Sequence, residues 1–376
     1  IEMLAVTLSK KARARAVQLP AWNEALGLPR PWDQQWSLRM QQILAYETDL
    51  LEHADLFDGS HVIESKVAEL KAAAKAELSR IEAAGGAVAS IDDMKRQLVE
   101  SNARRLAAIE KGESIVVGVN RYRETEPSPL STGDGAILTV GPEVEAEQVA
   151  RLEAWRSARD EKATAKALAD LEAAAREGRN IMEPSIAAAK AGVTTGEWGA
   201  TLRQVFGEYR APTGVARAAR VETDGIVQVR REVERVSAKL GRRIKMLVGK
   251  PGLDGHSNGA EQIAVRARDA GMEVVYEGIR LTPAEIVNAA LEEGVHVVGL
   301  SVLSGSHLAL VAEVLTGLRG AGLSDVPVIV GGIIPPADAA ALKAKGVAAV
   351  FTPKDYDLNA IMRAIVGVVE QGERAA

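Results

Sequence analysis

IKMLVG at residues 244–249 is the first of five short apolar runs that decide the fold of this chain. The others are MEVVY at 272–276, VHVVGLS at 295–301, VPVIV at 326–330 and VAAVF at 347–351. Helical segments separate the runs, and strands that are apolar on both faces and alternate with helices are typical of a parallel sheet covered on both sides. We therefore expect residues 244–376 to form an α/β domain with a flavodoxin-like, doubly wound, five-stranded parallel sheet.

Residues 1–243 lack this alternation and indicate mainly helices. Apolar residues at spacings of three and four predict helices over about 64–84 and 91–109, whereas SIVVGV at 114–119 predicts a short buried strand. In the second helix the spacing predicts that Met94, Leu98, Leu106 and Ile109 are buried. The composition between residues 143 and 177 is almost entirely Ala, Glu, Arg, Lys and Leu, which favours a linker helix.

Two capping boxes mark helix starts. Thr194 precedes Glu197 by three residues, and Thr282 precedes Glu285 by three, with Pro283 between them. A Thr hydroxyl and a Glu carboxylate at this spacing satisfy the free backbone N–H groups of a first turn. A further helix is expected over about 225–240, immediately before the first strand.

The composition bounds the class of protein. The 376 residues are 47% hydrophobic and 26% charged, which is typical of a globular chain long enough for two or three domains. The 46 basic and 51 acidic residues give a net charge of −5, so we expect no nucleic-acid partner. The chain has no cysteine, which excludes disulfides and thiolate metal sites. Because no apolar run is long enough to cross a bilayer, we expect no membrane contact and a cytoplasmic location.

The loop after the first strand carries a candidate metal ligand. In a doubly wound sheet, ligands bind beyond the carboxyl ends of the strands. This loop, KPGLDGHSNG at 250–259, fits neither the phosphate-binding nor the dinucleotide-binding glycine pattern. It places Asp254 two residues before His256, where a carboxylate can fix one ring nitrogen and leave the other for a metal. The alternative is a loop histidine that is only hydrogen-bonded locally.

Small residues follow the other strands. The third run ends in Ser301, with Leu303 and Gly305 after it, and the fourth ends in Gly331-Gly332. The fifth ends in Phe351-Thr352. Because glycine has no Cβ, it lets a long ligand approach the backbone closely. Together the loops predict a deep slot with a polarised histidine at its mouth.

These residues resemble the cobalamin-binding domain of the adenosylcobalamin-dependent acyl-CoA mutases. The resemblance consists of Asp254-x-His256-x-x-Gly259, Ser301-x-Leu303 and Gly331-Gly332, in that order on three strand ends. It implies that His256 is the lower axial ligand of the cobalt, with Asp254 and Lys250 behind it. It further implies that Ser301 bonds the buried benzimidazole and that the two glycines admit the nucleotide tail. The remaining cofactor contacts that it implies are Gly255, Ser257, Gly259, Leu303, Gly305, Phe351 and Thr352.

The resemblance extends to the start of the chain. WNEALGLP at 22–29 and IVVGVNRYR at 115–123 are similar to the end of the family's substrate-binding (β/α)₈ barrel, and Glu24 falls where the family has a carboxylate near the adenosyl ribose. The implied division is the C-terminal part of the barrel at 1–130, a helical linker at 131–243 and the cobalamin-binding domain at 244–376. Since a full barrel takes about 250 residues, we interpret the chain as the C-terminal portion of a mutase.

Two stretches resemble the ethylmalonyl-CoA branch of this family, namely LDGHSNGAEQIA at 253–264 and LPAWNEALGLPRPWDQQWSLR at 19–39. Ser257-Asn258 differs from the Asp-Arg pair that usually follows the histidine in the methylmalonyl-CoA branch. The resemblance therefore implies an isomerase that interconverts ethylmalonyl-CoA and methylsuccinyl-CoA by a radical carbon-skeleton rearrangement. It also implies an acyl-CoA substrate and a homodimer.

Three alternatives stay open from the sequence. The first is a methylmalonyl-CoA mutase. The second is a non-catalytic corrinoid carrier, which would have a compact helical cap directly before Lys245. The third is a flavodoxin-like domain without a metal, in which His256 is structural. Of the other histidines, His296 is expected to be a core residue. His307 is expected to be a packing residue at a helix start, with a place at the corrin face as the alternative.

Overall fold

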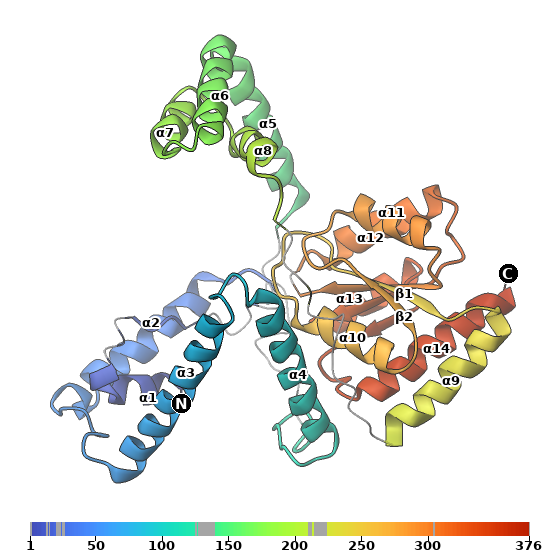
Figure 1. Cartoon of the computed structure of the whole chain (residues 1–376), viewed down its shortest axis with the longest axis horizontal. Coiled ribbons are helices and arrows are strands. Elements are labelled where there is room, and N and C mark those ends of the chain that lie inside the picture. The colour runs from blue at the N-terminus through green and yellow to red at the C-terminus, as the bar shows by residue number, and fades with distance from the viewer. Residues whose placement is uncertain are drawn as a thin grey trace. The chain divides into compact units, whose positions relative to one another are not determined.

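The computed structural model describes residues 2–12, 14, 16–19, 24, 27–124, 126, 140–209, 213, 224–303 and 305–375. The chain divides into two compact units (Figure 1). The first comprises residues 1–138 together with 212–376, and the second comprises residues 139–211. Trp22, which belongs to the first barrel-like stretch, lies outside the described residues.

The first unit contains a parallel sheet with the strand order β2-β1-β3-β4-β5, which confirms the predicted flavodoxin-like topology. Each of the five apolar runs supplies one strand. The strands are β1 (Lys245–Gly249), β2 (Glu273–Tyr276), β3 (Val297–Val302), β4 (Val328–Gly332) and β5 (Ala349–Phe351). Strands β1 and β3 pair in parallel at the centre of the sheet, and Val248 of β1 lies opposite Gly299 of β3.

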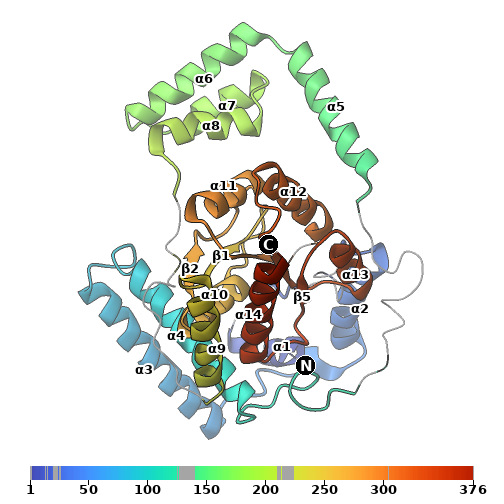
Figure 2. The ribbon, with the colours of Figure 1, turned by 90° about the vertical axis from the view of Figure 1, so that its right-hand side faces the viewer.

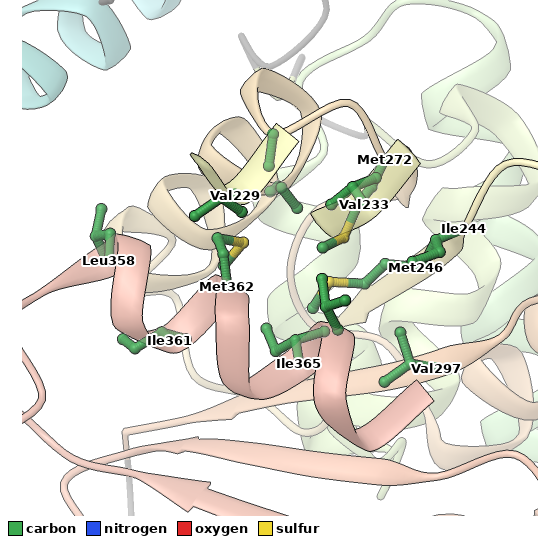
Figure 3. Close-up of a cluster of buried hydrophobic side chains, with 14 of the residues drawn as sticks. Val229, Val233, Ile244, Met246, Met272, Val297, Leu358, Ile361, Met362 and Ile365 are labelled. Atoms are coloured by element: carbon green, nitrogen blue, oxygen red, sulfur yellow. The ribbon is translucent and has the colours of Figure 1, made fainter. Parts of the chain in front are cut away.

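Helices cover both faces of this sheet, as the apolar strands require. They are α9 (Asp224–Leu240), α10 (Asn258–Asp269), α11 (Pro283–Glu293), α12 (His307–Gly320), α13 (Pro336–Ala344) and α14 (Leu358–Ala375). Side chains alternate along β1, so Met246 packs against α9, α10 and α14, while Leu247 packs on the face of α11 and α12. Figure 2 shows α9, α10 and α14 grouped on one face, and Figure 3 shows Met246 and Met362 in the core beneath them.

Local sequence signals explain where the helices begin and end. The hydroxyl of Thr282 accepts from the N–H of Glu285, whose carboxylate accepts from the N–H of Thr282, so the predicted capping box starts α11. The helix ends at Gly294, which adopts a left-handed conformation with φ 58°.

The chain before the sheet is helical. Its elements are α1 (Glu2–Leu8), a 3₁₀ turn η1 (Lys10–Ala12), α2 (Pro31–Tyr46), a second 3₁₀ turn η2 (Asp49–Leu51), α3 (His61–Ala83) and α4 (Ile91–Glu110). The helices predicted at 64–84 and 91–109 are thereby confirmed as α3 and α4. Helix α4 packs against α10 and contributes Val99 to the core of the sheet.

The strand predicted at 114–119 is wrong. This segment forms a turn with one isolated bridge between Val117 and Arg121. The side chain of Asn120 accepts from the N–H of Val116 and donates to the carbonyl of Ser114, at 2.8 Å in both cases. Those backbone groups are therefore bonded within the turn and not to a neighbouring strand.

The second unit contains α5 (Pro142–Ala158), α6 (Glu161–Arg176), α7 (Met182–Lys190) and α8 (Thr195–Phe206). The linker helix expected over 143–177 is two helices, because Asp160 caps the start of α6 through the N–H groups of Lys162 and Ala163. The capping box at Thr194 starts α8 as predicted. Among the described helices of both units, none has the length and apolar character needed to cross a bilayer.

Candidate functional site

A cavity of about 520 Å³ opens at the carboxyl edge of the sheet, within the size range of small-molecule and cofactor sites. The ends of β1, β3, β4 and β5 and the start of α10 supply most of its wall. Nine of the sequence-predicted residues line it: Lys250, His256, Gly259, Ser301, Leu303, Gly331, Gly332, Phe351 and Thr352. The parallel topology brings them together from loops up to 102 residues apart, since every strand ends at the same edge.

His256 is held by a short chain of hydrogen bonds that begins at the end of β1. The Nζ of Lys250 donates to Oδ2 of Asp254 at 2.5 Å, and Nδ1 of His256 donates to Oδ1 of the same carboxylate at 2.6 Å. The backbone N–H of His256 also donates to this oxygen, at 3.0 Å. The carboxylate therefore fixes both the tautomer and the direction of the ring, and leaves Nε2 without a partner among the described residues.

Burial differs sharply along this chain of residues. The side chain of Lys250 is 1% exposed and that of Asp254 is 8% exposed, whereas that of His256 is 76% exposed. Burial by itself raises the pKa of Asp254, but the hydrogen bonds from Lys250 and His256 outweigh it and lower the pKa to about 2. Asp254 is therefore a permanent anion at neutral pH, and it supports an imidazole that points into solvent at the mouth of the cavity.

The ends of β3 and β4 both contribute to the cavity wall. Ser301 is the register partner of Gly331, and Val302 is the partner of Gly332. A Cβ placed on Gly331 would have no atom within 4 Å, so a side chain here would enter the cavity. A Cβ on Gly332 would lie 1.8 Å from the carbonyl oxygen of Val302, so this position requires glycine for close approach of the two strands.

Phe351 and Thr352 close the cavity at the end of β5. The N–H and hydroxyl of Thr352 both donate to Asp355, at 2.8 and 3.3 Å, and this turn directs Tyr356 into the cavity wall. Gly259 lies in the first turn of α10, opposite Ser301, where a Cβ would come 3.8 Å from the hydroxyl oxygen.

Besides Asp254, four sequence-predicted residues lie outside the cavity lining. Gly255 and Ser257 flank His256 on its loop, Gly305 is exposed after β3, and Glu24 is exposed in a turn of the first part of the chain. The contact of each with a cofactor stays a prediction. Asp254 also lies outside the lining and reaches the site only through His256 and Lys250.

The sequence did not single out several residues of the wall. Leu106 and Ile109 of α4 and Val119 of the following turn line the cavity, as do Asn258 and Tyr356. The helical spacing of Leu106 and Ile109 predicted that they are buried, but it carried no information about what they face. Leu98, expected to be buried by the same spacing, is exposed.

Two further histidines have structural partners. Nδ1 of His296, which lies just before β3 and not within a buried strand, accepts from the N–H of Lys245 at 2.8 Å. His307, at the first turn of α12, is 3% exposed and its Nε2 bonds Asp338 at 2.9 Å. The pair joins the segment after β3 to the first turn of α13, after β4.

The arrangement fits a large prosthetic group that carries its own metal. His256 offers one free nitrogen, and the cavity beside it is lined mainly by aliphatic side chains and glycines. An apolar cavity next to a single oriented donor can hold a flat ring system while the donor completes the coordination of its metal. The open position at Gly331 leaves room for a ring in the cavity beside the ends of β3 and β4.

Comparison with known families agrees with this geometry. Residues 4–208 match the sequence model described as methylmalonyl-CoA mutase, and residues 244–361 match that of the B12 binding domain. The chain belongs to the methylmalonyl-CoA mutase family. The family resemblance is thereby confirmed, and cobalamin is confirmed as the cofactor of the sheet domain.

Curated relatives in this mutase family match over most or all of the chain. An ethylmalonyl-CoA mutase of Cereibacter sphaeroides is 67% identical over 376 residues, which are 100% of this chain and 58% of the relative. An ethylmalonyl-CoA mutase of Methylorubrum extorquens is 64% identical over 380 residues, covering 100% of this chain and 55% of the relative. A methylmalonyl-CoA mutase of Cereibacter sphaeroides is 38% identical over 339 residues, covering 89% of this chain and 47% of the relative. The chain thus spans less than two thirds of the length of these relatives.

Proposed function

We propose that this chain is the cobalamin-binding part of an adenosylcobalamin-dependent isomerase that interconverts ethylmalonyl-CoA and methylsuccinyl-CoA. The identities of 67% and 64% to two ethylmalonyl-CoA mutases, against 38% to a methylmalonyl-CoA mutase, support the ethylmalonyl-CoA branch. The chain's Ser257-Asn258 pair, which follows the histidine, supports the same choice.

One observation carries the proposal: the hydrogen-bonded series Lys250, Asp254 and His256 ends in an exposed imidazole at the mouth of an apolar cavity. In this proposal Nε2 of His256 ligates the cobalt. Asp254 holds the ring in position through Nδ1, and Lys250 holds Asp254. Ser301 and Gly331, which face each other across β3 and β4, hold the nucleotide tail.

When bound, adenosylcobalamin supplies the radical chemistry of the carbon-skeleton rearrangement. This chain's own residues bind and orient. The aliphatic wall excludes water from the buried tail, and the buried Lys250–Asp254 pair keeps the imidazole in one tautomer. We include the contacts of Gly255, Ser257, Gly305 and Glu24 with the cofactor in the proposal.

The proposal also covers the organisation of the chain. Residues 1–130 would belong to the substrate-binding barrel, residues 131–243 to a helical linker and residues 244–376 to the cobalamin-binding domain. The family matches at 4–208 and 244–361 support a division between a mutase part and a cofactor part. An acyl-CoA substrate, a cytoplasmic location and a homodimer complete the proposal.

The first experiment tests axial ligation. Cobalamin is titrated into the chain, and the visible spectrum and the nitrogen hyperfine pattern of the reduced, paramagnetic cobalt are recorded. We expect hyperfine coupling to one protein nitrogen, which His256→Ala abolishes. His53→Ala is the matched control, because His53 is also an exposed histidine beside an aspartate, Asp49. Retention of the protein nitrogen signal in His256→Ala contradicts the assignment.

The second experiment tests the reaction. A chimera is made in which this chain replaces the matching 58% of the Cereibacter sphaeroides ethylmalonyl-CoA mutase. We expect turnover of ethylmalonyl-CoA at a higher kcat/KM than methylmalonyl-CoA. A folded, cobalamin-loaded chimera without isomerase activity would instead favour a corrinoid carrier, and preference for methylmalonyl-CoA would favour the other branch of the family.

A further inference from the structure

We propose that helix α4 forms part of the cavity wall that contacts cobalamin, and that Glu110 is the positioning residue that holds α4 there. Helix α4 precedes the matched B12 binding domain by more than 130 residues. This inference rests on the proposed function in that it takes cobalamin as the occupant of the cavity. It adds that cobalamin binding requires a segment outside residues 244–361, which are the residues that match the B12 binding domain.

The wall itself consists of three apolar side chains. Leu106 and Ile109 on α4 and Val119 in the following turn line the same cavity as His256 and Gly331. Ile109 is 7% exposed, so its surface is removed from solvent by the packing of α4 on the sheet domain. A ligand in this cavity would therefore lose apolar contacts if α4 moved away.

Glu110, the last residue of α4, ties this wall to two parts of the sheet domain. Its carboxylate accepts two hydrogen bonds from the guanidinium of Arg266 on α10, at 2.8 and 3.0 Å. It also accepts from the backbone N–H of Leu358 at the start of α14, at 3.2 Å. The side chains of Glu110 and Arg266 are 12% and 8% exposed, so water offers little replacement for a lost partner.

A second ion pair fixes the other end of the contact. Lys95 near the start of α4 donates to Glu261 in the first turn of α10 at 2.9 Å, and the side chain of Glu261 is 6% exposed. Helix α10 begins at Asn258, two residues after His256. The pairs on α4 therefore hold both ends of the helix that carries the loop of the proposed cobalt ligand.

The turn after α4 extends the wall to the loop after β5. Asn120 fixes this turn by bonding the carbonyls of Ile109 and Ser114, at 2.9 and 2.8 Å. Beyond it, the guanidinium of Arg123 lies over the ring of Tyr356, 5.5 Å from the centroid, and Tyr356 lines the cavity. Contacts at α10, at α14 and at Tyr356 thus hold one continuous segment, residues 95–123, against the site.

The experiment uses the full chain and the variant Glu110→Gln. Glu370→Gln is the matched control, because Glu370 on α14 also pairs with an arginine of another helix, Arg235 on α9, and lies outside the cavity lining. Amide hydrogen exchange is measured without ligand, and the dissociation constant of cobalamin is measured by titration. We expect Glu110→Gln to raise exchange in α4 and to weaken cobalamin binding by about tenfold, and Glu370→Gln to do neither.

A second variant tests the wall without disturbing the ion pair. Val119→Ala trims the wall from the turn, away from the packing of α4, and we expect about threefold weaker binding with unchanged exchange in α4. This variant keeps the inference open to refutation if Glu110→Gln does not fold.

The outcomes separate this inference from the proposed function. Unchanged exchange in Glu110→Gln overturns the role of Glu110, and faster exchange with unchanged cobalamin affinity overturns the role of α4 as a wall. Unchanged affinity in Val119→Ala counts against the wall as well. If the wild-type chain itself fails to bind cobalamin, the proposed function fails, and the cavity wall loses its ligand with it.

Discussion

Ser301 at the end of β3 lies directly opposite Gly331 at the end of β4, and both residues line the cavity at the carboxyl edge of the sheet. The pairing sets a hydroxyl against a position without a side chain. The cavity wall at this pair of residues is therefore open to a ligand at Gly331 and supplies a hydrogen-bonding hydroxyl at Ser301.

Filling the space at Gly331 should block the cofactor. A Cβ at Gly331 meets no atom within 4 Å, so Gly331→Leu can place its side chain in the cavity without unfolding the sheet. We expect cobalamin affinity to fall by at least about a hundredfold with little change in thermal stability. Gly320→Leu is the control, because Gly320 ends α12 and a Cβ there also meets nothing within 4 Å. Normal cobalamin binding by Gly331→Leu would show that the tail does not enter here.

The neighbouring glycine should behave differently. A Cβ at Gly332 would lie 1.8 Å from the carbonyl oxygen of Val302, so Gly332→Ala forces β3 and β4 apart. We expect a loss of about 2–4 kcal/mol in the free energy of unfolding, measured with denaturant. Gly331→Ala, one residue earlier, should change it by less than about 0.5 kcal/mol. Equal effects at the two positions would contradict this account of the strand contact.

Acid should weaken the sheet domain through Asp254. Its pKa is about 2 in the folded chain, below the ordinary 3.8, so its stabilising contribution is complete above about pH 4 and is lost as the pH falls through about 2. The difference corresponds to about 2 kcal/mol. The free energy of unfolding is measured with denaturant between about pH 5 and 2, the range of this titration. Over this range the wild type should lose about 2 kcal/mol more of it than Asp254→Asn does. If the free energy of unfolding of the two proteins falls in parallel with pH, the lowered pKa of Asp254 does not stabilise the domain.

At neutral pH the same substitution should be costly for another reason. Asp254→Asn leaves the ammonium of Lys250, which is 1% exposed, without its charged partner. Breaking a buried pair on one side destabilises by about 3–5 kcal/mol, whereas replacing both partners costs much less. We therefore expect Lys250→Met to restore part of the stability that Asp254→Asn loses, as read from the unfolding free energies of the two single variants and the double variant. No recovery in the double variant would contradict the pairing.

The contact between His307 and Asp338 should stabilise the segments that follow β3 and β4. His307 is 3% exposed and its Nε2 bonds Asp338, which joins the segments that follow β3 and β4. Asp338→Ala leaves a buried ring nitrogen without a partner, and we expect a loss of about 1–3 kcal/mol in the free energy of unfolding. Asp338→Asn keeps an acceptor at this position and should lose less. Equal losses in the two variants would show that the hydrogen bond contributes nothing.

The sheet and the strand ends could be predicted from the sequence because both follow from local patterns. Five apolar runs between helices determine a parallel sheet, and a parallel sheet places all of its carboxyl ends at one edge. Lys250, His256, Ser301 and Gly331 could therefore be expected together before any coordinates. Their role around a bound cofactor stays a prediction.

Other features depend on contacts that no local pattern contains. The spacing of Leu106 and Ile109 shows that α4 has an apolar face, but its partner lies about 150 residues later in α10. The apolar run at 114–119 has the composition of a strand, but it forms a turn, because the side chain of Asn120 bonds its backbone groups. The close approach at Gly332 follows from the register of β3 and β4, which the sequence does not state.

Because the ammonium of Lys250 lies almost wholly inside the protein and depends on a carboxylate four residues away, neither residue can be replaced singly without penalty. Evolution should therefore treat the two as a unit. Homologous domains that lack one of the two residues are expected to lack the other. Domains that keep both can still hold an imidazole in the outward orientation.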